Sequence, residues 1–188
     1  GSVRVTGATE AIGRTGLKPS IPAAARRQFL AAGDRGRIVH KMCELHDIGQ
    51  AEDYDMDPSL QGYLDAWESF CRDFKYQPDF VEVPLGNPDF LYGCIPDTAG
   101  YSGHLGGYAV VERKQTRYAR WKELQLEAQR MALFADGRTP VYKILVELRV
   151  DGTYVPTMCR DQKARGIFLA AVTVANRQIS EGLMGWLG

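Results

Sequence analysis

The hydrophobic residues of this chain change their spacing near Asp79, and that change constrains the fold more than any other feature. Before it, apolar side chains recur at helical spacing from Leu60 to Phe74, behind a Pro58 that suits the first turn of a helix. After it come three strand-like runs separated by turn residues, over 80–85, 90–97 and 108–113. Consecutive strands joined by short turns predict an antiparallel meander that follows a helix.

Further helices are expected on either side of this meander. Upstream, the sequence predicts a short helix over 22–30 that Gly33 interrupts, and a second helix that has Asp34 as its N-cap and ends near Gly49. Downstream it predicts, in order, a helix over 118–135, strands over 141–150 and 153–158, and a helix over 161–180. Because a helical crossover permits a parallel neighbour strand, we expect an α/β fold with a central mixed sheet flanked by helices, in the order αβββαβ.

The length of 188 residues suits one domain, which we expect to span residues 21–188. Residues 1–20 show no clear periodicity, and Gly1-Ser2 resembles the remnant of a cleaved expression tag, so we expect a poorly structured N-terminus. No apolar run approaches the roughly 20 residues that cross a bilayer, so no membrane partner is expected. The four cysteines form no Cys-x-x-Cys pair, which disfavours an iron–sulfur cluster and favours free thiols in a reducing cytoplasm.

Charged residues balance overall, 23 basic against 23 acidic, but they are unevenly distributed. Residues 51–100 hold 2 Lys or Arg against 11 Asp or Glu, whereas residues 101–150 hold 9 against 5. Screening over about 8 to 10 Å makes local charge count for more than the total. A nucleic-acid partner is therefore compatible with a net charge of zero.

Two acids and a lysine flank the hairpin in the middle of the chain. Asp97 comes before its glycine-rich turn, and Glu112 and Lys114 follow on the next strand, where alternation points both side chains to one face and that of Arg113 to the other. Two carboxylates and a main-chain carbonyl make an adequate Mg²⁺ site, and a nearby ammonium can orient water or bind phosphate. The simpler interpretation, a solvated strand pair, is disfavoured because this strand is otherwise apolar.

These motifs, in this order, resemble the PD-(D/E)XK nuclease superfamily. Pro96-Asp97 and Glu112-x-Lys114 match its signature, and Gln125 falls on the helix that follows. The chain looks most like the RecB-like and phage-type exonuclease branch, because Arg35-Gly36-x-x-x-His40 matches an upstream helix motif of that branch. The branch often places a tyrosine four residues after the glutamine, where this chain has Gln129. The resemblance covers about residues 33 to 135.

The resemblance implies a restriction-endonuclease-like core and a Mg²⁺- or Mn²⁺-dependent deoxyribonuclease. An exonuclease is favoured over an endonuclease, with 5′-phosphate and 3′-hydroxyl products. The implied metal ligands are His40, Asp97, Glu112 and the main-chain carbonyl of Arg113. The implied catalytic set is Asp97, Glu112, Lys114, which would position the attacking water, and Gln125, which would assist. Glu82, on the first strand of the meander, either reaches the metal or sits at a sheet edge.

Basic residues lie beside both halves of this predicted site, where a DNA backbone would need them. The candidates for nucleic-acid contact are Arg35, Arg37, Arg117, Arg120, Lys122 and, for stacking on a base, Tyr118. Two other functions stay open: a non-catalytic module that binds nucleic acid or protein on the same fold, and a structure-specific endonuclease. A homo-oligomer, or a separate recombination or helicase partner, is also compatible with the sequence.

Overall fold

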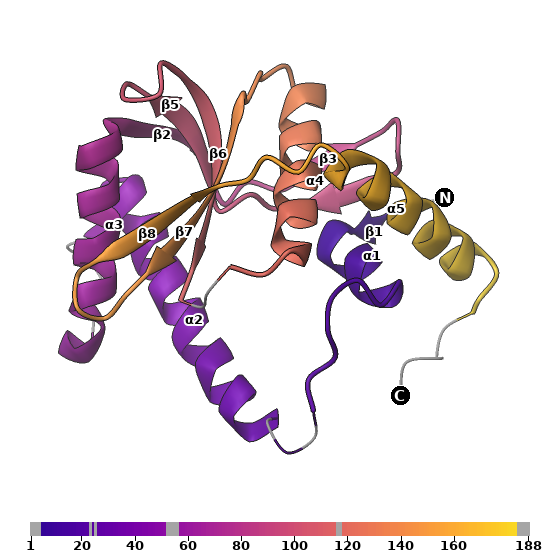
Figure 1. Ribbon diagram of the computed structural model, residues 1–188, viewed down its shortest axis with the longest axis horizontal. Coiled ribbons are helices and arrows are strands. Elements are labelled where there is room, and N and C mark those ends of the chain that lie inside the picture. The colour runs from indigo at the N-terminus through magenta and orange to yellow at the C-terminus, as the bar shows by residue number, and fades with distance from the viewer. Residues whose placement is uncertain (1–4, 23, 25, 52–56, 116–117, 184–188) are drawn as a thin grey trace.

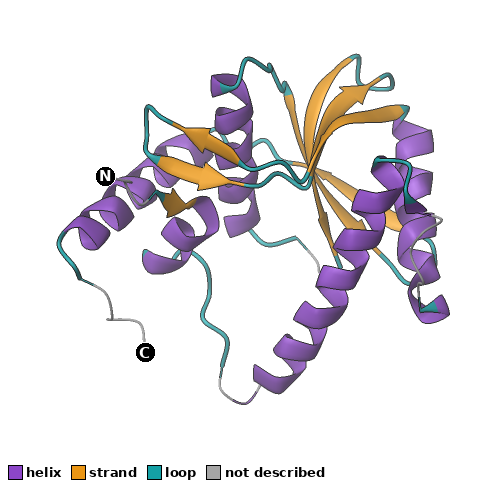
Figure 2. Cartoon of the chain, turned by 180° about the vertical axis from the view of Figure 1, so that it is seen from behind, coloured by secondary structure: helices purple, strands orange, loops and turns teal. Residues whose placement is uncertain are grey.

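The computed structural model describes residues 5–22, 24, 26–51, 57–115 and 118–183, and a five-stranded mixed sheet forms its centre (Figures 1 and 2). The strands are β2 (Tyr76–Val81), β5 (Thr98–Ser102), β6 (Gly107–Lys114), β7 (Tyr142–Leu148) and β8 (Tyr154–Met158). They lie in the order β2-β5-β6-β7-β8, with β6 parallel to β7 and the other neighbours antiparallel.

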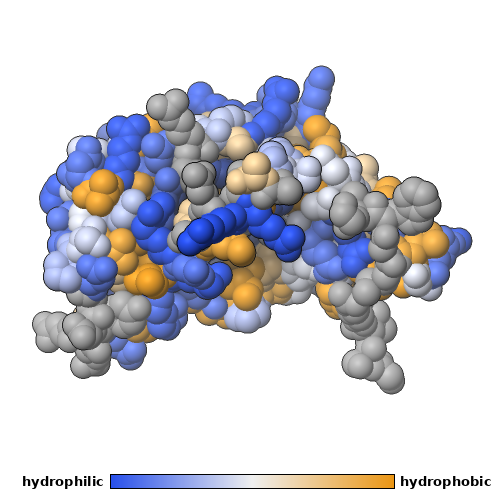
Figure 3. Space-filling model, turned by 90° about the horizontal axis from the view of Figure 1, so that it is seen from below, coloured by the Kyte–Doolittle hydropathy of each residue, from blue (hydrophilic) through white to orange (hydrophobic). Residues whose placement is uncertain are grey.

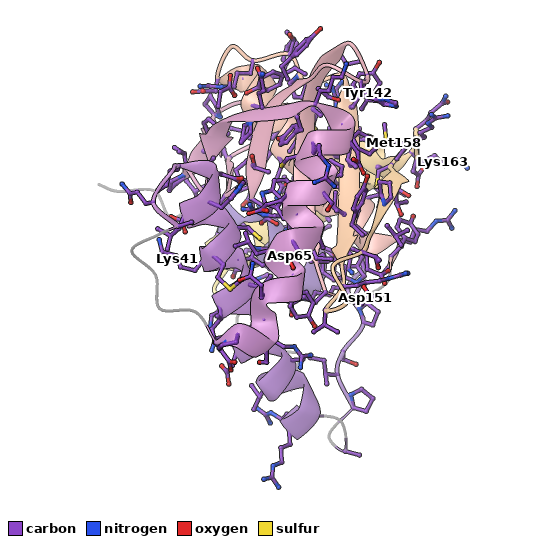
Figure 4. All side chains as sticks on the ribbon, turned by 90° about the vertical axis from the view of Figure 1, so that its left-hand side faces the viewer. Lys41, Asp65, Tyr142, Asp151, Met158 and Lys163 are labelled. Atoms are coloured by element: carbon purple, nitrogen blue, oxygen red, sulfur yellow. The ribbon has the colours of Figure 1, made fainter. Side chains whose placement is uncertain are left out.

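Helices cover both faces of this sheet. They are α1 (Ala8–Arg14), α2 (Arg26–Asp47), α3 (Gln61–Phe74, after a 3-10 turn at Pro58–Leu60), α4 (Trp121–Ala135) and α5 (Ala164–Ser180). Figure 4 shows α2 and α3 together in front of one face of the sheet. Figure 1 shows α4 on the other face, with α1 and α5 on the side of α4 that is away from the sheet. A second, small sheet pairs β1 (Thr6–Gly7), β4 (Tyr92–Cys94) and β3 (Leu85–Asn87).

The core follows from alternation along β6. Ala109 and Val111 join the hydrophobic cluster under α2 and α3, whereas Val110 between them joins the cluster that packs with α4. Successive side chains of a strand point to opposite faces, so one apolar strand supplies both cores. The same alternation continues into the charged end of the strand.

The expected α/β architecture with a mixed, helix-flanked sheet is confirmed, and so is the parallel pairing after the helical crossover. The expected strands of the meander are partly wrong. The strand predicted over 90–97 belongs, as β4, to the small sheet, and the middle strand of the main sheet is Thr98–Ser102. The sequence analysis assigns no strand to this segment, which is short and includes Gly100. The glycine is needed there, because a Cβ would lie 2.1 Å from the Gln77 carbonyl oxygen of β2.

Two upstream expectations are also wrong. Residues 26–47 form one helix through Gly33, and Asp34 pairs with Arg37 inside it instead of capping it. A glycine costs a helix about 1 kcal/mol relative to alanine, which weakens a long helix without ending it. The N-terminus is structured where it is described: α1 buries Ala11 and Ile12 against α4 and α5. Gly1-Ser2 lies outside the described residues.

Seen from below, the described part of the surface mixes hydrophilic and hydrophobic residues (Figure 3). Within the described ranges, no helix has the length and apolarity that crossing a membrane would require.

Gly62 gives a test of the packing between α3 and the β7–β8 turn. A Cβ at this position would lie 1.8 Å from the Val150 carbonyl oxygen, whereas a Cβ at Gly33 of α2 meets nothing within 4 Å. We expect Gly62→Ala to destabilise the fold by about 1–3 kcal/mol through overpacking. Gly33→Ala should instead stabilise it by about 0.5–1 kcal/mol, as in any open helix interior. Urea denaturation measures both, and equal effects would contradict the packing.

Candidate active site

The register of β5 and β6 brings the two predicted acids to the same end of the hairpin. Thr98 pairs with Val111, so Asp97, just before β5, lies across from Glu112. Asp97 is 6% exposed and Glu112 fully buried. The two acids therefore lie at the same end of the hairpin, as the sequence predicts. Their side chains are held by different parts of the structure.

His40, Glu82 and Asp97 form a compact group of metal-ligand side chains. His40 Nδ1 lies 3.5 Å from Asp97 Oδ2 and 3.8 Å from Glu82 Oε1. One ligand atom from each of the three lies within 4.8 Å of the others. Glu82 has a left-handed φ of 49°, which a residue with a side chain rarely adopts, and strain of this kind gathers at functional sites.

Arg113 holds Asp97 from behind. Its main-chain N–H donates to Asp97 Oδ2 at 2.7 Å, and its guanidinium donates to the Asp97 carbonyl at 3.1 Å. The same guanidinium pairs with Asp47 at 2.7 Å and lies 4.9 Å from the centre of the Trp67 ring. Trp67 Nε1 donates to the other Asp47 oxygen at 2.7 Å, so the acid that neutralises Arg113 is itself fixed.

Glu112 is held from the opposite side of β6. Gln125 Nε2 donates to Oε1 at 2.6 Å and Gln129 Nε2 donates to Oε2 at 2.7 Å, both from α4. Lys114, two residues along the strand, forms an ion pair with Oε1. The predicted alternation is therefore observed: Glu112 and Lys114 share one face and the Arg113 side chain occupies the other.

The charges of this group shift two pKa values. Burial lowers the pKa of His40, but the carboxylates of Asp97 and Glu82 more than offset it, so the His40 pKa is raised above its usual 6.5. Burial also opposes the charge of Lys114, yet Glu112 and Asp97 raise its pKa above the ordinary value. Lys114 therefore stays an ammonium at neutral pH and donates hydrogen bonds.

A cleft of about 610 Å³ opens over this group, and His40, Glu82 and Lys114 line it. Basic side chains surround them in the lining, namely Lys18, Arg37, Lys41 and Lys122. Burial, and then the neighbouring Lys114 ammonium, lower the pKa of Lys122 to about 8. The cleft is thus positive around an acidic centre, which suits a phosphate-bearing ligand.

The candidates for nucleic-acid contact divide into two groups. Arg37 and Lys122 line the cleft, whereas Arg35, Arg120 and Tyr118 are exposed and do not line it. The Tyr118 hydroxyl donates to the Glu123 carboxylate. Arg117 lies outside the described residues.

Asp47 is not predicted from the sequence, and Gln129 stands out there only as a departure from the pattern of the branch that the chain resembles. Both can be found by helical spacing: Asp47 lies two turns after His40, and Gln129 lies one turn after Gln125. The sequence did not decide whether Glu82 reaches the metal site, and the structure places it in the group with His40 and Asp97.

No protein-family model matches the sequence, and no curated protein matches it. Among the solved structures that are similar to this chain, two have 13% identity to it. One is the crystal structure of LHK-Exo in complex with dAMP, with a TM-score of 0.44 over 95% of this chain and 91% of that chain. The other is an alkaline exonuclease (LHK-Exo) from Laribacter hongkongensis, with a TM-score of 0.38 over 95% and 93%. Both TM-scores are low, so this likeness by itself decides nothing about the site.

The His40 group predicts a pH response in the metal-free protein. NMR titration should give His40 a pKa above 6.5, and Asp97→Asn should lower it, because burial then dominates. The charged contact stabilises the fold fully below the unfolded-state pKa and is lost as pH rises through the raised folded-state pKa. Glu44→Gln, an equal change of charge one turn along α2, should leave His40 nearly unchanged. A wild-type value below 6.5 would contradict the geometry.

The buried pair of Arg113 and Asp47 predicts a large loss of stability when one partner is removed. Asp47→Asn should cost about 3–5 kcal/mol, because it leaves the buried Arg113 charge with only the longer ion pair to Glu82 at 3.6 Å. The matched change Asp34→Asn breaks an exposed pair with Arg37 and should alter stability little. Denaturant titration of both variants measures the two losses of stability. Similar midpoints would show that the pair of Arg113 and Asp47 contributes no more to stability than the exposed pair does.

Proposed function

We propose that the chain is a divalent-metal-dependent deoxyribonuclease, an exonuclease that leaves 5′-phosphate and 3′-hydroxyl ends. The observation that carries the proposal is the convergence of His40, Glu82 and Asp97 within 4.8 Å at a cleft that Lys114 also lines. Acids gathered around a histidine and a lysine, with Asp97 buried and Glu82 at a positive cleft, are costly to assemble for stability alone.

The donor set fits a hard divalent cation. Two carboxylates with one imidazole supply mainly oxygen ligands, which Mg²⁺ and Mn²⁺ prefer. Glu112 and the main-chain carbonyl of Arg113 complete the proposed ligand set. When bound, such an ion would neutralise charge on the reacting phosphate and make hydroxide available near neutral pH. We propose Mg²⁺ or Mn²⁺ as the cofactor, and no iron–sulfur cluster.

The side chains of the chain have separate tasks in this proposal. Lys114, kept protonated, donates to the attacking water or to the scissile phosphate and does not act as a base. Gln125 assists by holding Glu112, to which it donates at 2.6 Å. Arg37 and Lys122 lie where a DNA backbone entering the cleft would need cations. Arg35, Arg120, Arg117 and Tyr118 remain candidates for contacts farther along the strand.

Nuclease assays test the proposal directly. Purified protein should degrade linear DNA with Mg²⁺ or Mn²⁺ and stop with a chelator. Asp97→Asn, Glu112→Gln and Lys114→Ala should each lower the rate by about 100-fold or more, because each removes a charge from the reacting centre. Asp136→Asn, beyond the end of α4, should keep the wild-type rate. Activity that survives all three site substitutions would come from a contaminant and would defeat the proposal.

The form of the substrate separates the alternatives. An exonuclease spares closed circular DNA and releases nucleotides from end-labelled linear DNA, whereas cleaved circles would favour a structure-specific endonuclease. A non-catalytic binding module would bind DNA without any Mn²⁺ site, which isothermal titration with Mn²⁺ would reveal. The same assay with single-stranded DNA reports strand preference and polarity.

A further inference from the structure

The carboxylate of Glu112 is held by three donors that occupy its two oxygens unequally. Gln125 Nε2 and the Lys114 ammonium both bond to Oε1, whereas Gln129 Nε2 alone bonds to Oε2, at 2.7 Å. A carboxylate offers about four acceptor positions, two on each oxygen. Counting the described residues, two donors therefore bond to Oε1 and one donor, Gln129, bonds to Oε2.

Gln129 donates to Glu112 from a buried side chain whose own amide oxygen is left without a donor among the described residues. It is 1% exposed, and its Oε1 has no hydrogen-bond partner in the part of the chain that the structure describes. Its Nε2 reaches Glu112, with only a distant second acceptor in the Ile95 carbonyl at 3.5 Å. A buried acceptor without a donor destabilises a fold, so packing alone would favour an apolar residue here.

We propose that Gln129 is a positioning residue that sets the orientation of the Glu112 carboxylate and, through it, the affinity of the site for the divalent cation. The inference rests on the proposed function and extends it, because it assigns a role to a position where the family resemblance would place tyrosine. Gln129 touches neither cation nor DNA. It fixes the rotation of the carboxylate, whose terminal torsion is otherwise broad.

A purely structural role for Gln129 makes different predictions. If it only filled space between α4 and β6, an apolar side chain of similar shape would leave cation binding intact. If it positions Glu112, the same change would spare the fold and weaken the site, because partners that orient a metal ligand typically account for about 10- to 100-fold in affinity or activity.

The test compares Gln129→Met with Gln125→Met and with Leu133→Met, a fully buried α4 position that packs elsewhere. Melting temperature, Mn²⁺ affinity by isothermal titration, and kcat and KM on linear DNA are measured for each. We expect Gln129→Met to melt within about 5 °C of wild type, to bind Mn²⁺ about 10- to 100-fold more weakly, and to lose kcat with KM for DNA unchanged. Gln125→Met should lose less Mn²⁺ affinity, because Lys114 still holds Oε1. Leu133→Met should match wild type in all three.

Each other outcome overturns the inference. Unchanged Mn²⁺ affinity in Gln129→Met assigns the residue to packing, and an equal loss in Leu133→Met assigns the effect to α4 as a whole. An equal or larger loss of affinity in Gln125→Met would show that Gln129 has no special part in holding the Glu112 carboxylate. These results differ from failure of the proposed function, in which the wild-type protein itself binds no Mn²⁺ and cuts no DNA.

Discussion

The buried ion pair between Arg113 and Asp47 is the interaction on which the arrangement of the site depends. Both side chains are almost wholly removed from water, where a charge is tolerated only if it is paired and hydrogen-bonded. The pair joins the end of β6 to the end of α2, and Trp67 of α3 braces the acid. Because α2 is fixed there, His40, two turns earlier on the same helix, is held against Asp97. The Arg113 guanidinium also donates to the Asp97 carbonyl. Arg113 therefore helps to position both His40, through α2, and Asp97.

The alternation of β6 separates opposite tasks on three consecutive residues. The Arg113 side chain faces the helices α2 and α3, whereas Glu112 faces α4 and Lys114, on the same side of the strand, lines the cleft. The two acids of the site therefore have independent supports: Asp97 is held by the Arg113 main chain and Glu112 by amides of α4. Because alternate side chains point to opposite faces, the charge of Arg113 pairs with Asp47 on one face and does not neutralise Glu112 on the other.

The sequence predicted the parts of the site that depend on order and period. The convergence of Asp97 with Glu112, and the shared face of Glu112 and Lys114, follow from a hairpin and from strand alternation. It did not predict what depends on tertiary contact. Thr98–Ser102 is a strand because Gly100 lets β2 approach, not because of its composition. Glu82 joins the ligand group through a left-handed backbone, and α1 folds against α4 and α5 with too few apolar residues to show a period.

The raised pKa of His40 connects these supports to the proposed chemistry. In the protein without a cation, Asp97 and Glu82, whose carboxylate oxygens lie 3.5 and 3.8 Å from His40 Nδ1, favour the protonated form of that histidine. A divalent cation that used the imidazole as a ligand would have to displace that proton, because a metal binds the neutral form. Under the proposed function, cation affinity therefore rises with pH through the pKa of His40. The same carboxylates that would attract the ion also favour the competing proton on His40.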